Sequence, residues 1–187
     1  TKLLYHNKYL KLIYIYNIKN SKNECSSLVN IENNKGESGY ILYTSGTTGN
    51  PKGVIQKSES IFYMIEEYFN TIGITSDDIV GLVTSFNHTV AAIDMFSALL
   101  TGATIAAFDL KNDGGIESFI EWIKKEKITV YHSVPTLFRN ICYKGKKVFN
   151  DIRLVILGGE AVLKTDVDLF KNKFASHSTM VNLFGAS

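Results

Sequence analysis

The chain has few of the features that mark metal-binding, membrane or nucleic-acid-binding proteins. It has two cysteines, Cys25 and Cys142, which lie far apart and match no metal-ligand spacing, so we interpret both as reduced thiols of a cytoplasmic protein. No apolar run reaches the roughly 18 residues that a membrane span needs. The formal net charge is only +2 and the lysines are scattered, so the sequence predicts neither a nucleic acid nor a membrane as a partner.

The composition is that of a globular protein. Of the 187 residues, 45% are hydrophobic and 20% are charged, a balance that allows one ordinary domain with a sizeable core. The sequence begins at Thr1 and shows no signal-peptide pattern. We therefore expect a piece of a longer polypeptide.

Two segments follow one another along the chain. Residues 1–39 begin with a region dense in Ile, Leu and Tyr, in which we expect a strand, and continue as a polar surface connection. Residues 40–187 begin with a short β-prone run that leads straight into a glycine-rich loop. Beyond this loop, apolar side chains recur at helical spacing over residues 61–72, with Ser58 as the expected cap and Gly73 as the end.

Strands and helices then alternate. The pattern predicts strands at residues 79–83, 104–108, 128–134, 154–157 and 180–184, and helices at residues 90–100, 116–125, 136–143 and 166–173. Such alternation is typical of an α/β fold, in which a largely parallel sheet is flanked by helices. Ligands bind beyond the carboxyl ends of the strands in these sheets. We therefore expect the chemistry in the loops that follow the strands, including the loop after residues 40–43.

The glycine-rich loop has the composition of a polyphosphate cradle. Glycines let backbone N–H groups converge on an anion, hydroxyls add donors, and a lysine adds a positive charge. We expect phosphate contacts from Thr44, Ser45, Gly46, Thr47, Thr48, Gly49 and Lys52, and assign catalytic roles to Thr48 and Lys52. The loop is not a Walker A motif, because Pro51 stands where that pattern needs a glycine and Gly53 where it needs Ser or Thr. This excludes a P-loop phosphotransferase.

Residues 43–54, Tyr-Thr-Ser-Gly-Thr-Thr-Gly-Asn-Pro-Lys-Gly-Val, resemble the signature loop of the adenylate-forming (AMP-binding) superfamily. This superfamily includes the adenylation domains of nonribosomal peptide synthetases, acyl-CoA synthetases and luciferases. Two further segments resemble the family in the right order. Residues 157–161, Leu-Gly-Gly-Glu-Ala, are similar to the strand-end turn that approaches the adenosine, and residues 182–187 are similar to the Asn-x-Tyr-Gly-x-Thr-Glu segment.

The resemblance implies ATP and Mg²⁺ as cofactors and gives roles to residues that follow two strands. Phe184 takes the aromatic position that stacks on adenine, and Asn182 lies near the adenine edge. Gly158, Gly159, Glu160 and Gly185 belong to the wall of that site, and the hydroxyl of Ser187 can contact the phosphates. The family's magnesium-holding Glu comes one residue after Ser187, and its catalytic Lys belongs to a small C-terminal subdomain. We expect both to lie outside this chain, so that residues 1–187 are inactive alone.

The resemblance also places the acid-binding region at residues 85–100. Peptide-synthetase domains have an Asp here that anchors the α-ammonium group of the substrate, and this chain has Asn87 or Thr89, depending on the alignment. His88 matches a histidine beside the acyl pocket of acyl-CoA synthetases; the alternative interpretation is a histidine that caps a helix or bonds a backbone carbonyl. By their positions on strand ends, the pocket could also be lined by Ile93, His132, Val155, Leu157 and Leu183. Core packing alone would also predict mostly apolar residues there.

These features together predict a fragment of an ATP-dependent carboxylate-activating ligase. The resemblance implies that a small carboxylic acid first forms an acyl-adenylate, and that coenzyme A or a phosphopantetheine carrier protein then takes the acyl group. The sequence leaves both the peptide-synthetase and the acyl-CoA synthetase types open. The alternative is a degenerate, non-catalytic nucleotide-binding module, which would belong to a parent chain without the catalytic Glu and Lys.

Overall fold

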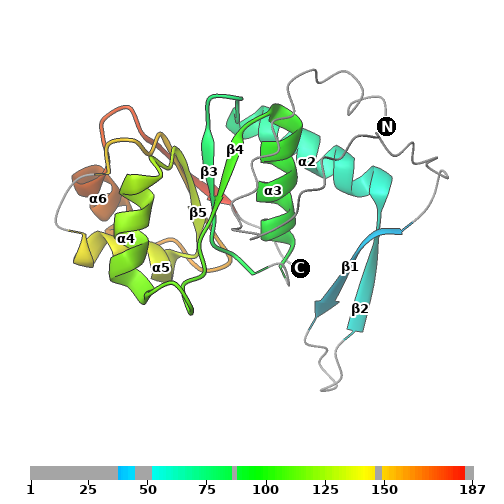
Figure 1. Cartoon of the computed structure of the whole chain (residues 1–187), viewed down its shortest axis with the longest axis horizontal. Coiled ribbons are helices and arrows are strands. Elements are labelled where there is room, and N and C mark those ends of the chain that lie inside the picture. The colour runs from blue at the N-terminus through cyan, green and yellow to red at the C-terminus, as the bar shows by residue number, and fades with distance from the viewer. Residues whose placement is uncertain (1–37, 45–51, 86–87, 146–148, 184–187) are drawn as a thin grey trace, which may run out of the picture.

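A five-stranded parallel sheet forms the centre of the molecule (Figure 1). The computed structural model describes residues 38–44, 52–85, 88–145 and 149–183. The order of the strands is β4-β3-β5-β6-β7, and every neighbouring pair is parallel. Their bounds are β3 Ile79–Leu82, β4 Thr104–Ala107, β5 Val130–Ser133, β6 Leu154–Gly158 and β7 Thr179–Leu183. The α/β class predicted from the alternating pattern is confirmed.

Helices cover both faces of this sheet (Figure 1). The helices α2 (Ser58–Ile72) and α3 (Thr89–Thr101) lie on one face. The other face is covered by α4 (Gly115–Lys125), α5 (Pro135–Lys144) and α6 (Lys164–Lys173). Parallel strands that are covered on both faces read as continuous apolar runs, which explains why the sequence of β6 is Leu-Val-Ile-Leu-Gly.

Alternate residues of the central strands pack into two separate clusters, because successive side chains of a strand point to opposite faces. Tyr131 joins the larger cluster with the buried residues of α4 and α5, whereas its neighbour Val130 joins the smaller one with Ala98 of α3. The strand β6 divides in the same way. Val155 and Leu157 belong to the larger cluster, and Leu154 and Ile156 to the smaller.

The segment around the glycine-rich loop differs from the sequence prediction. The strand β1 (Ser38–Thr44) pairs with β2 (Lys52–Lys57) in an antiparallel hairpin, and these two strands form a sheet of their own. The β-prone run at residues 40–43 is thus a strand, but one outside the parallel sheet, and no strand was predicted for residues 52–57. The sequence of β2, Lys-Gly-Val-Ile-Gln-Lys, has no clear alternation of apolar and polar residues. It therefore lacks the pattern from which a strand would be predicted.

Two helix ends follow the local sequence signals, whereas one expected helix start does not. Gly73 and Gly102 end α2 and α3 in the left-handed conformation, as their sequence positions predict. Ser58, the expected cap of α2, is its first helical residue instead, and the N-cap is Lys57. The reason is that β2 ends at Lys57 and α2 begins at the next residue, which leaves no connecting turn. The strand predicted near the N-terminus lies outside the described residues.

None of the described helices is both long and apolar enough to cross a membrane.

Candidate active site

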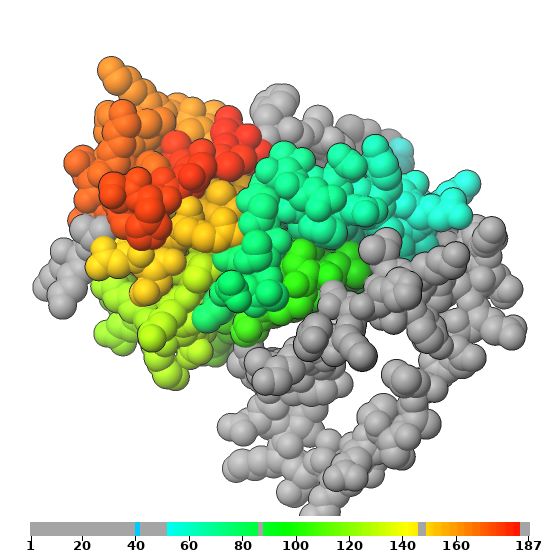
Figure 2. Space-filling model, turned by 90° about the horizontal axis from the view of Figure 1, so that it is seen from above, coloured from blue at the N-terminus to red at the C-terminus, as the bar shows by residue number. Residues whose placement is uncertain are grey.

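The carboxyl edge of the sheet brings together residues that the sequence placed in separate motifs. Gly158 ends β6 and pairs with Leu183, which ends β7. His132 lies on the neighbouring strand β5, opposite Ile156. His88 and Thr89 lie where α3 begins, in the connection that follows β3. Val181 and Leu183 of β7 pack in the same cluster as Tyr68, Phe69 and Ile72 of α2. Figure 2 shows β7 (red) at the surface beside this helix.

The hairpin closes the base of the glycine-rich loop. Thr44, the last residue of β1, pairs with Lys52, the first residue of β2, and the side chain of Lys52 is exposed. The loop residues Ser45, Gly46, Thr47, Thr48 and Gly49 lie outside the described residues, as do Asn87, Phe184, Gly185 and Ser187. The described part therefore fixes the two ends of the predicted phosphate loop, one of which carries its lysine.

Gly158 lies where a side chain would be crowded. A Cβ atom at this position would come within 3.0 Å of the carbonyl oxygen of Leu183 and 3.8 Å of Nε2 of His132. A contact of 3.0 Å between a Cβ and a backbone oxygen is tight, so the neighbouring strand would have to give by a few tenths of an ångström. The absence of a side chain at Gly158 therefore leaves the Nε2 edge of the imidazole facing the backbone at the end of β6.

His132 is held by a carboxylate from α3. Its Nδ1 lies 2.9 Å from Oδ1 of Asp94, and each side chain is only 2% exposed. The hydroxyl of Tyr68, on α2, lies 3.4 Å from the same Nδ1, and the rings of Tyr68 and His132 stack with centroids 6.4 Å apart. Burial raises the pKa of Tyr68 far above its ordinary value, and the charge of Asp94 and a hydrogen bond to it raise it further.

No binding or catalytic role was predicted for Asp94 or Tyr68 from the sequence. Asp94 is the sole charged side chain in a helix otherwise made of apolar residues, Ser and Thr, and a lone acid on an apolar helix was the signal that could have found it. Its partner, 38 residues further along the chain, could not be read from spacing. Tyr68 shares the apolar periodicity of α2, which hides its hydroxyl among core positions.

The structure places two residues of the predicted acid pocket on a different face from His132. Val155 and Leu157 are fully buried in the larger core cluster, on the α4 and α5 face, whereas His132 points to α2 and α3. Leu183 packs on the same side as His132, and Ile93 is buried on α3, next to Asp94 in sequence. The described residues that can share a pocket are therefore His132, Leu183 and the start of α3.

Glu160 contacts a helix end. Its carboxylate Oε2 accepts hydrogen bonds from the backbone nitrogen of Thr136 at 3.0 Å and from its hydroxyl at 2.6 Å. Gly159, before it, makes the turn after β6 in the left-handed conformation, with φ at 79°. Asn182 pairs with Leu157 and is exposed, so it lies on the α4 and α5 side of β7. Asn182 and Glu160, two of the residues expected near adenine, therefore lie on the opposite side of the strands from His132, whereas Gly158 faces it.

His88 precedes α3 as its N-cap. Its backbone is extended and its side chain makes no capping hydrogen bond, so the alternative interpretation as a capping side chain is wrong. The imidazole is exposed. The imidazole of His88 is therefore accessible to solvent where the connection from β3 meets α3.

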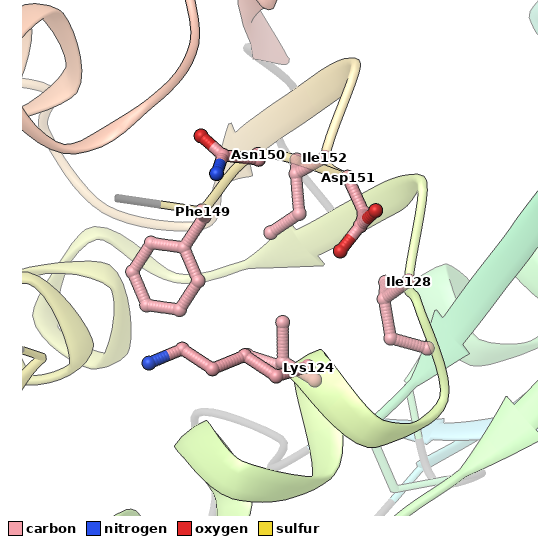
Figure 3. Close-up of a pocket in the computed structure, with 7 residues that line it drawn as sticks. Lys124, Ile128, Phe149, Asn150, Asp151 and Ile152 are labelled. Atoms are coloured by element: carbon pink, nitrogen blue, oxygen red, sulfur yellow. The ribbon is translucent and has the colours of Figure 1, made fainter. Parts of the chain in front are cut away.

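The protein has a cavity elsewhere, of about 220 Å³, next to the amino ends of β5 and β6 (Figure 3). It is lined by Ile123, Lys124, Ile128, Phe149, Asn150, Asp151 and Ile152. The ammonium group of Lys124 lies over the ring of Phe149, 5.7 Å from its centroid. None of these residues belongs to the predicted motifs, and ligands of such sheets bind at the opposite edge.

A model of the AMP-binding enzyme family matches residues 9–187. The chain belongs to the AMP-binding enzyme family. This confirms the resemblance inferred from the three motifs. The match also begins well before Tyr40, so it reaches into the segment that the sequence pattern treated as a separate connection.

Curated relatives of this AMP-binding chain are large synthases. A plipastatin synthase subunit of Bacillus subtilis is 29% identical over 177 residues, which cover 93% of this chain and 7% of that protein. Surfactin synthase subunit 2 of the same organism is 30% identical over 150 residues, covering 78% of the chain and 4% of that protein. The chain thus spans a small fraction of the length of the relatives it matches.

Solved structures show the same fold. The Vibrio cholerae adenylation domain AlmE, in complex with glycyl-adenosine-5'-phosphate, matches with a TM-score of 0.73 and 23% identity, over 84% of this chain and 30% of that one. The O-succinylbenzoate coenzyme A synthetase MenE of Bacillus subtilis, in complex with ATP and magnesium ion, matches with a TM-score of 0.70 and 20% identity, over 81% and 31%.

The described residues fit one part of a nucleotide site. The hairpin holds Lys52 at the end of a loop rich in N–H and hydroxyl donors, a set that suits phosphate oxygens. Among these described residues, no group of three or more His, Cys, Asp or Glu side chains could hold a metal ion.

Proposed function

We propose that this chain is part of an ATP-dependent ligase that activates a carboxylic acid as an acyl-adenylate. The observation that carries the proposal is the register of the hairpin, which pairs Thr44 with Lys52 at the two ends of the family's signature loop. The fold and the family support it, since the chain is an AMP-binding enzyme by its sequence.

In this reaction the chain would mainly position the acid and ATP and neutralise the negative charge of the phosphates. The acid's carboxylate attacks the α-phosphorus of ATP, and pyrophosphate leaves. Lys52, Thr48 and the neighbouring loop donors would hold the leaving β- and γ-phosphates, where negative charge develops. Phe184 would stack on adenine, with Asn182, Gly158, Gly159, Glu160 and Gly185 around it and the Ser187 hydroxyl near the phosphates.

A thiol then receives the acyl group. The peptide synthases among the relatives support a phosphopantetheine carrier protein as that partner, and the coenzyme A synthetase fold neighbour supports coenzyme A. We propose the carrier protein first, because its support comes from sequence relatives rather than from the fold alone. Both thiol partners suit a cytoplasmic location.

Acid-dependent exchange of pyrophosphate into ATP tests the proposal. The complete polypeptide that contains these residues should exchange in the presence of its acid, while residues 1–187 alone should bind adenine nucleotide weakly and not turn over. A complete polypeptide that binds ATP but exchanges with no carboxylic acid would instead be the non-catalytic nucleotide-binding module. Measurable exchange by residues 1–187 would contradict the expected need for a further subdomain.

A further inference from the structure

The turn between β6 and α6, residues 159–163, is held against α5 at two points. The carboxylate of Glu160 accepts two hydrogen bonds from Thr136. Nη2 of Arg139 donates a hydrogen bond to the carbonyl oxygen of Ala161 at 3.3 Å. Among the described residues, every hydrogen bond between this turn and α5 involves a side chain. The position of the turn therefore depends on a few side chains rather than on backbone pairing.

Arg139 is itself held by a carboxylate of α6. Its Nε donates to Oδ1 of Asp166 at 2.7 Å and its Nη2 to Oδ2 at 2.8 Å. The side chain of Asp166 is 0% exposed and that of Arg139 is 25% exposed. Oδ2 of Asp166 also accepts a hydrogen bond at 2.8 Å from the backbone nitrogen of Leu163, where the turn ends. One guanidinium thereby connects α5 to the middle of the turn directly and to its end through Asp166.

The contact between Arg139 and Asp166 calls for an arginine. The hydrogen bonds from Arg139 hold the pKa of Asp166 below its ordinary value, although burial alone would raise it. The pair is therefore ionised at neutral pH. The planar guanidinium reaches the carboxylate with two nitrogens and the carbonyl of Ala161 with one of them. A lysine ammonium at this position would keep the charge but not this planar, two-pronged geometry.

The held turn lies at the carboxyl edge of the sheet, where ligands of parallel sheets bind. Gly159, Glu160 and Ala161 are exposed, and the proposed function assigns the first two, with Gly158, to the wall of the adenine site. A wall made of a turn binds a ligand tightly only when the turn is already ordered, because ordering it on binding costs free energy. The side chains that hold the turn therefore bear on the affinity for the nucleotide.

We propose that Arg139, oriented by Asp166, fixes the turn between β6 and α6 in the position that binds the adenosine part of ATP. The inference rests on the nucleotide site of the proposed function and adds to it a residue that lies outside the three motifs. Arg139 is a positioning residue, because it reaches the nucleotide only through the turn.

ATP binding by the complete polypeptide tests this role. The Kd for ATP is measured by isothermal titration calorimetry without acid, and the KM values for ATP and acid are measured in the exchange assay. Arg139→Met keeps much of the apolar stem and should raise Kd and KM for ATP about 10-fold, since the freed turn must be ordered on binding. The KM for the acid should change less than about 2-fold. An unchanged Kd for ATP in folded Arg139→Met would overturn the proposal.

A purely structural role predicts a different result. It would lower the fraction of active enzyme, and so the apparent kcat, without changing Kd or KM for ATP. Lys144→Met is the matched control, because this lysine also lies on α5 and pairs with the exposed Glu117, away from the turn. It should leave the Kd for ATP unchanged. Equal increases of Kd in Lys144→Met and Arg139→Met would contradict a specific role of Arg139.

Two further variants keep the test decisive if Arg139→Met does not fold. Arg139→Lys retains the charge beside Asp166 and should bind ATP more weakly than the wild type. Asp166→Asn removes the charge that orients Arg139 and should also raise the Kd for ATP, whereas the exposed Asp168→Asn on the same helix should not. ATP binding as tight as in the wild type by folded Arg139→Lys and Asp166→Asn would overturn the proposal.

The two proposals fail differently. An unchanged Kd for ATP in Arg139→Met, together with intact acid-dependent exchange, would refute this inference and leave the ligase standing. Exchange with no carboxylic acid, together with a raised Kd for ATP in Arg139→Met, would refute the ligase and leave the positioning role standing. A complete polypeptide that binds no ATP would refute both.

Discussion

The carboxylate of Glu160 bonds to Thr136 at the start of α5, through the hydroxyl at 2.6 Å and the backbone nitrogen at 3.0 Å. The N-cap of this helix is Val134, whose side chain cannot accept a hydrogen bond. Glu160 therefore satisfies one of the free N–H groups of the first turn and places negative charge at the positive end of the helix dipole. A residue that the family resemblance assigns to the nucleotide site thus has a structural role of its own.

Replacing Glu160 should destabilise the protein apart from any effect on nucleotide binding. We expect Glu160→Ala to lower the free energy of unfolding by about 1 kcal/mol, the usual loss for a removed cap. Glu160→Gln keeps an oxygen acceptor and should lose less. Trp122, the single tryptophan, packs against Phe119 in the core, and its fluorescence reports urea unfolding. Glu121→Ala, an exposed position, is the control; a Glu160→Ala variant as stable as the control would show that the cap contributes nothing.

At His88 a substitution should stabilise the protein, because the side chain at this N-cap position makes no capping hydrogen bond. We expect His88→Asn to stabilise the protein by about 0.5–1 kcal/mol, since Asn accepts a hydrogen bond from the first turn of α3. If His88 contacts the acid, the same variant should lower acid-dependent exchange in the complete polypeptide. His177→Asn, exposed near the other end of the sheet, should change neither. Unchanged rate and acid preference in His88→Asn would remove His88 from the site.

The sheet and its helices could be predicted because their signals are local. Apolar runs of strand length, helical periodicity, and Gly73 and Gly102 at helix ends each act over a few residues. The pairing of β1 with β2 could not be predicted, because it depends on partners across a loop rather than on the residues of 52–57 themselves. The three motifs could be found for the same reason as the helices, because each is a short run of consecutive residues.

The face of the sheet that each candidate pocket residue takes could not be predicted from the sequence. In a strand covered on both faces, every residue is apolar, so composition does not tell which face a side chain takes. Val155 and Leu157 share a strand with Gly158, yet the alternation of the strand sends both to the α4 and α5 side. The pair of Asp94 and His132 joins segments 38 residues apart, and only the fold brings these segments together.

Lys52 offers a direct test of the phosphate loop. We expect Lys52→Ala to raise KM for ATP about 10-fold in the exchange assay, because it removes a charge-assisted hydrogen bond worth about 1.5–3 kcal/mol. Lys57→Ala is a matched control, since this lysine lies at the other end of the same strand and is also exposed. The effect of Lys52→Ala should shrink at high salt, which screens exposed charges. Equal effects of the two substitutions would mean that Lys52 acts only through the overall charge of the hairpin.

An ion pair between the buried Asp78 and the partly exposed Arg153 holds the amino ends of the strands together. The guanidinium of Arg153, just before β6, donates two hydrogen bonds to the carboxylate of Asp78, just before β3. The hydroxyl of Thr129, before β5, donates a third at 2.8 Å, and the backbone nitrogen of Thr75 a fourth at 2.8 Å. One carboxylate thereby joins the starts of three neighbouring strands.

Removing that charge should destabilise the sheet in a way that depends on pH. Burial alone would raise the pKa of Asp78, but the hydrogen bonds from Arg153, Thr75 and Thr129 hold it below its usual value. Because the folded pKa is the lower one, the stabilisation is fully present above the unfolded value of about 3.9 and is lost as pH falls through the folded value. Asp78→Asn should therefore cost about 2–4 kcal/mol at pH 7, and the gap to the wild type should narrow below about pH 4.

Urea unfolding followed by Trp122 fluorescence between pH 7 and pH 3 measures this gap. The adjacent Asp77 is exposed, so Asp77→Asn changes the net charge equally without touching Arg153. It should change the stability little, because its side chain is exposed. A gap for Asp78→Asn that stays constant down to pH 3 would mean that the substitution acts through packing alone. A gap that narrows as pH falls attributes it to the charge that Arg153 neutralises.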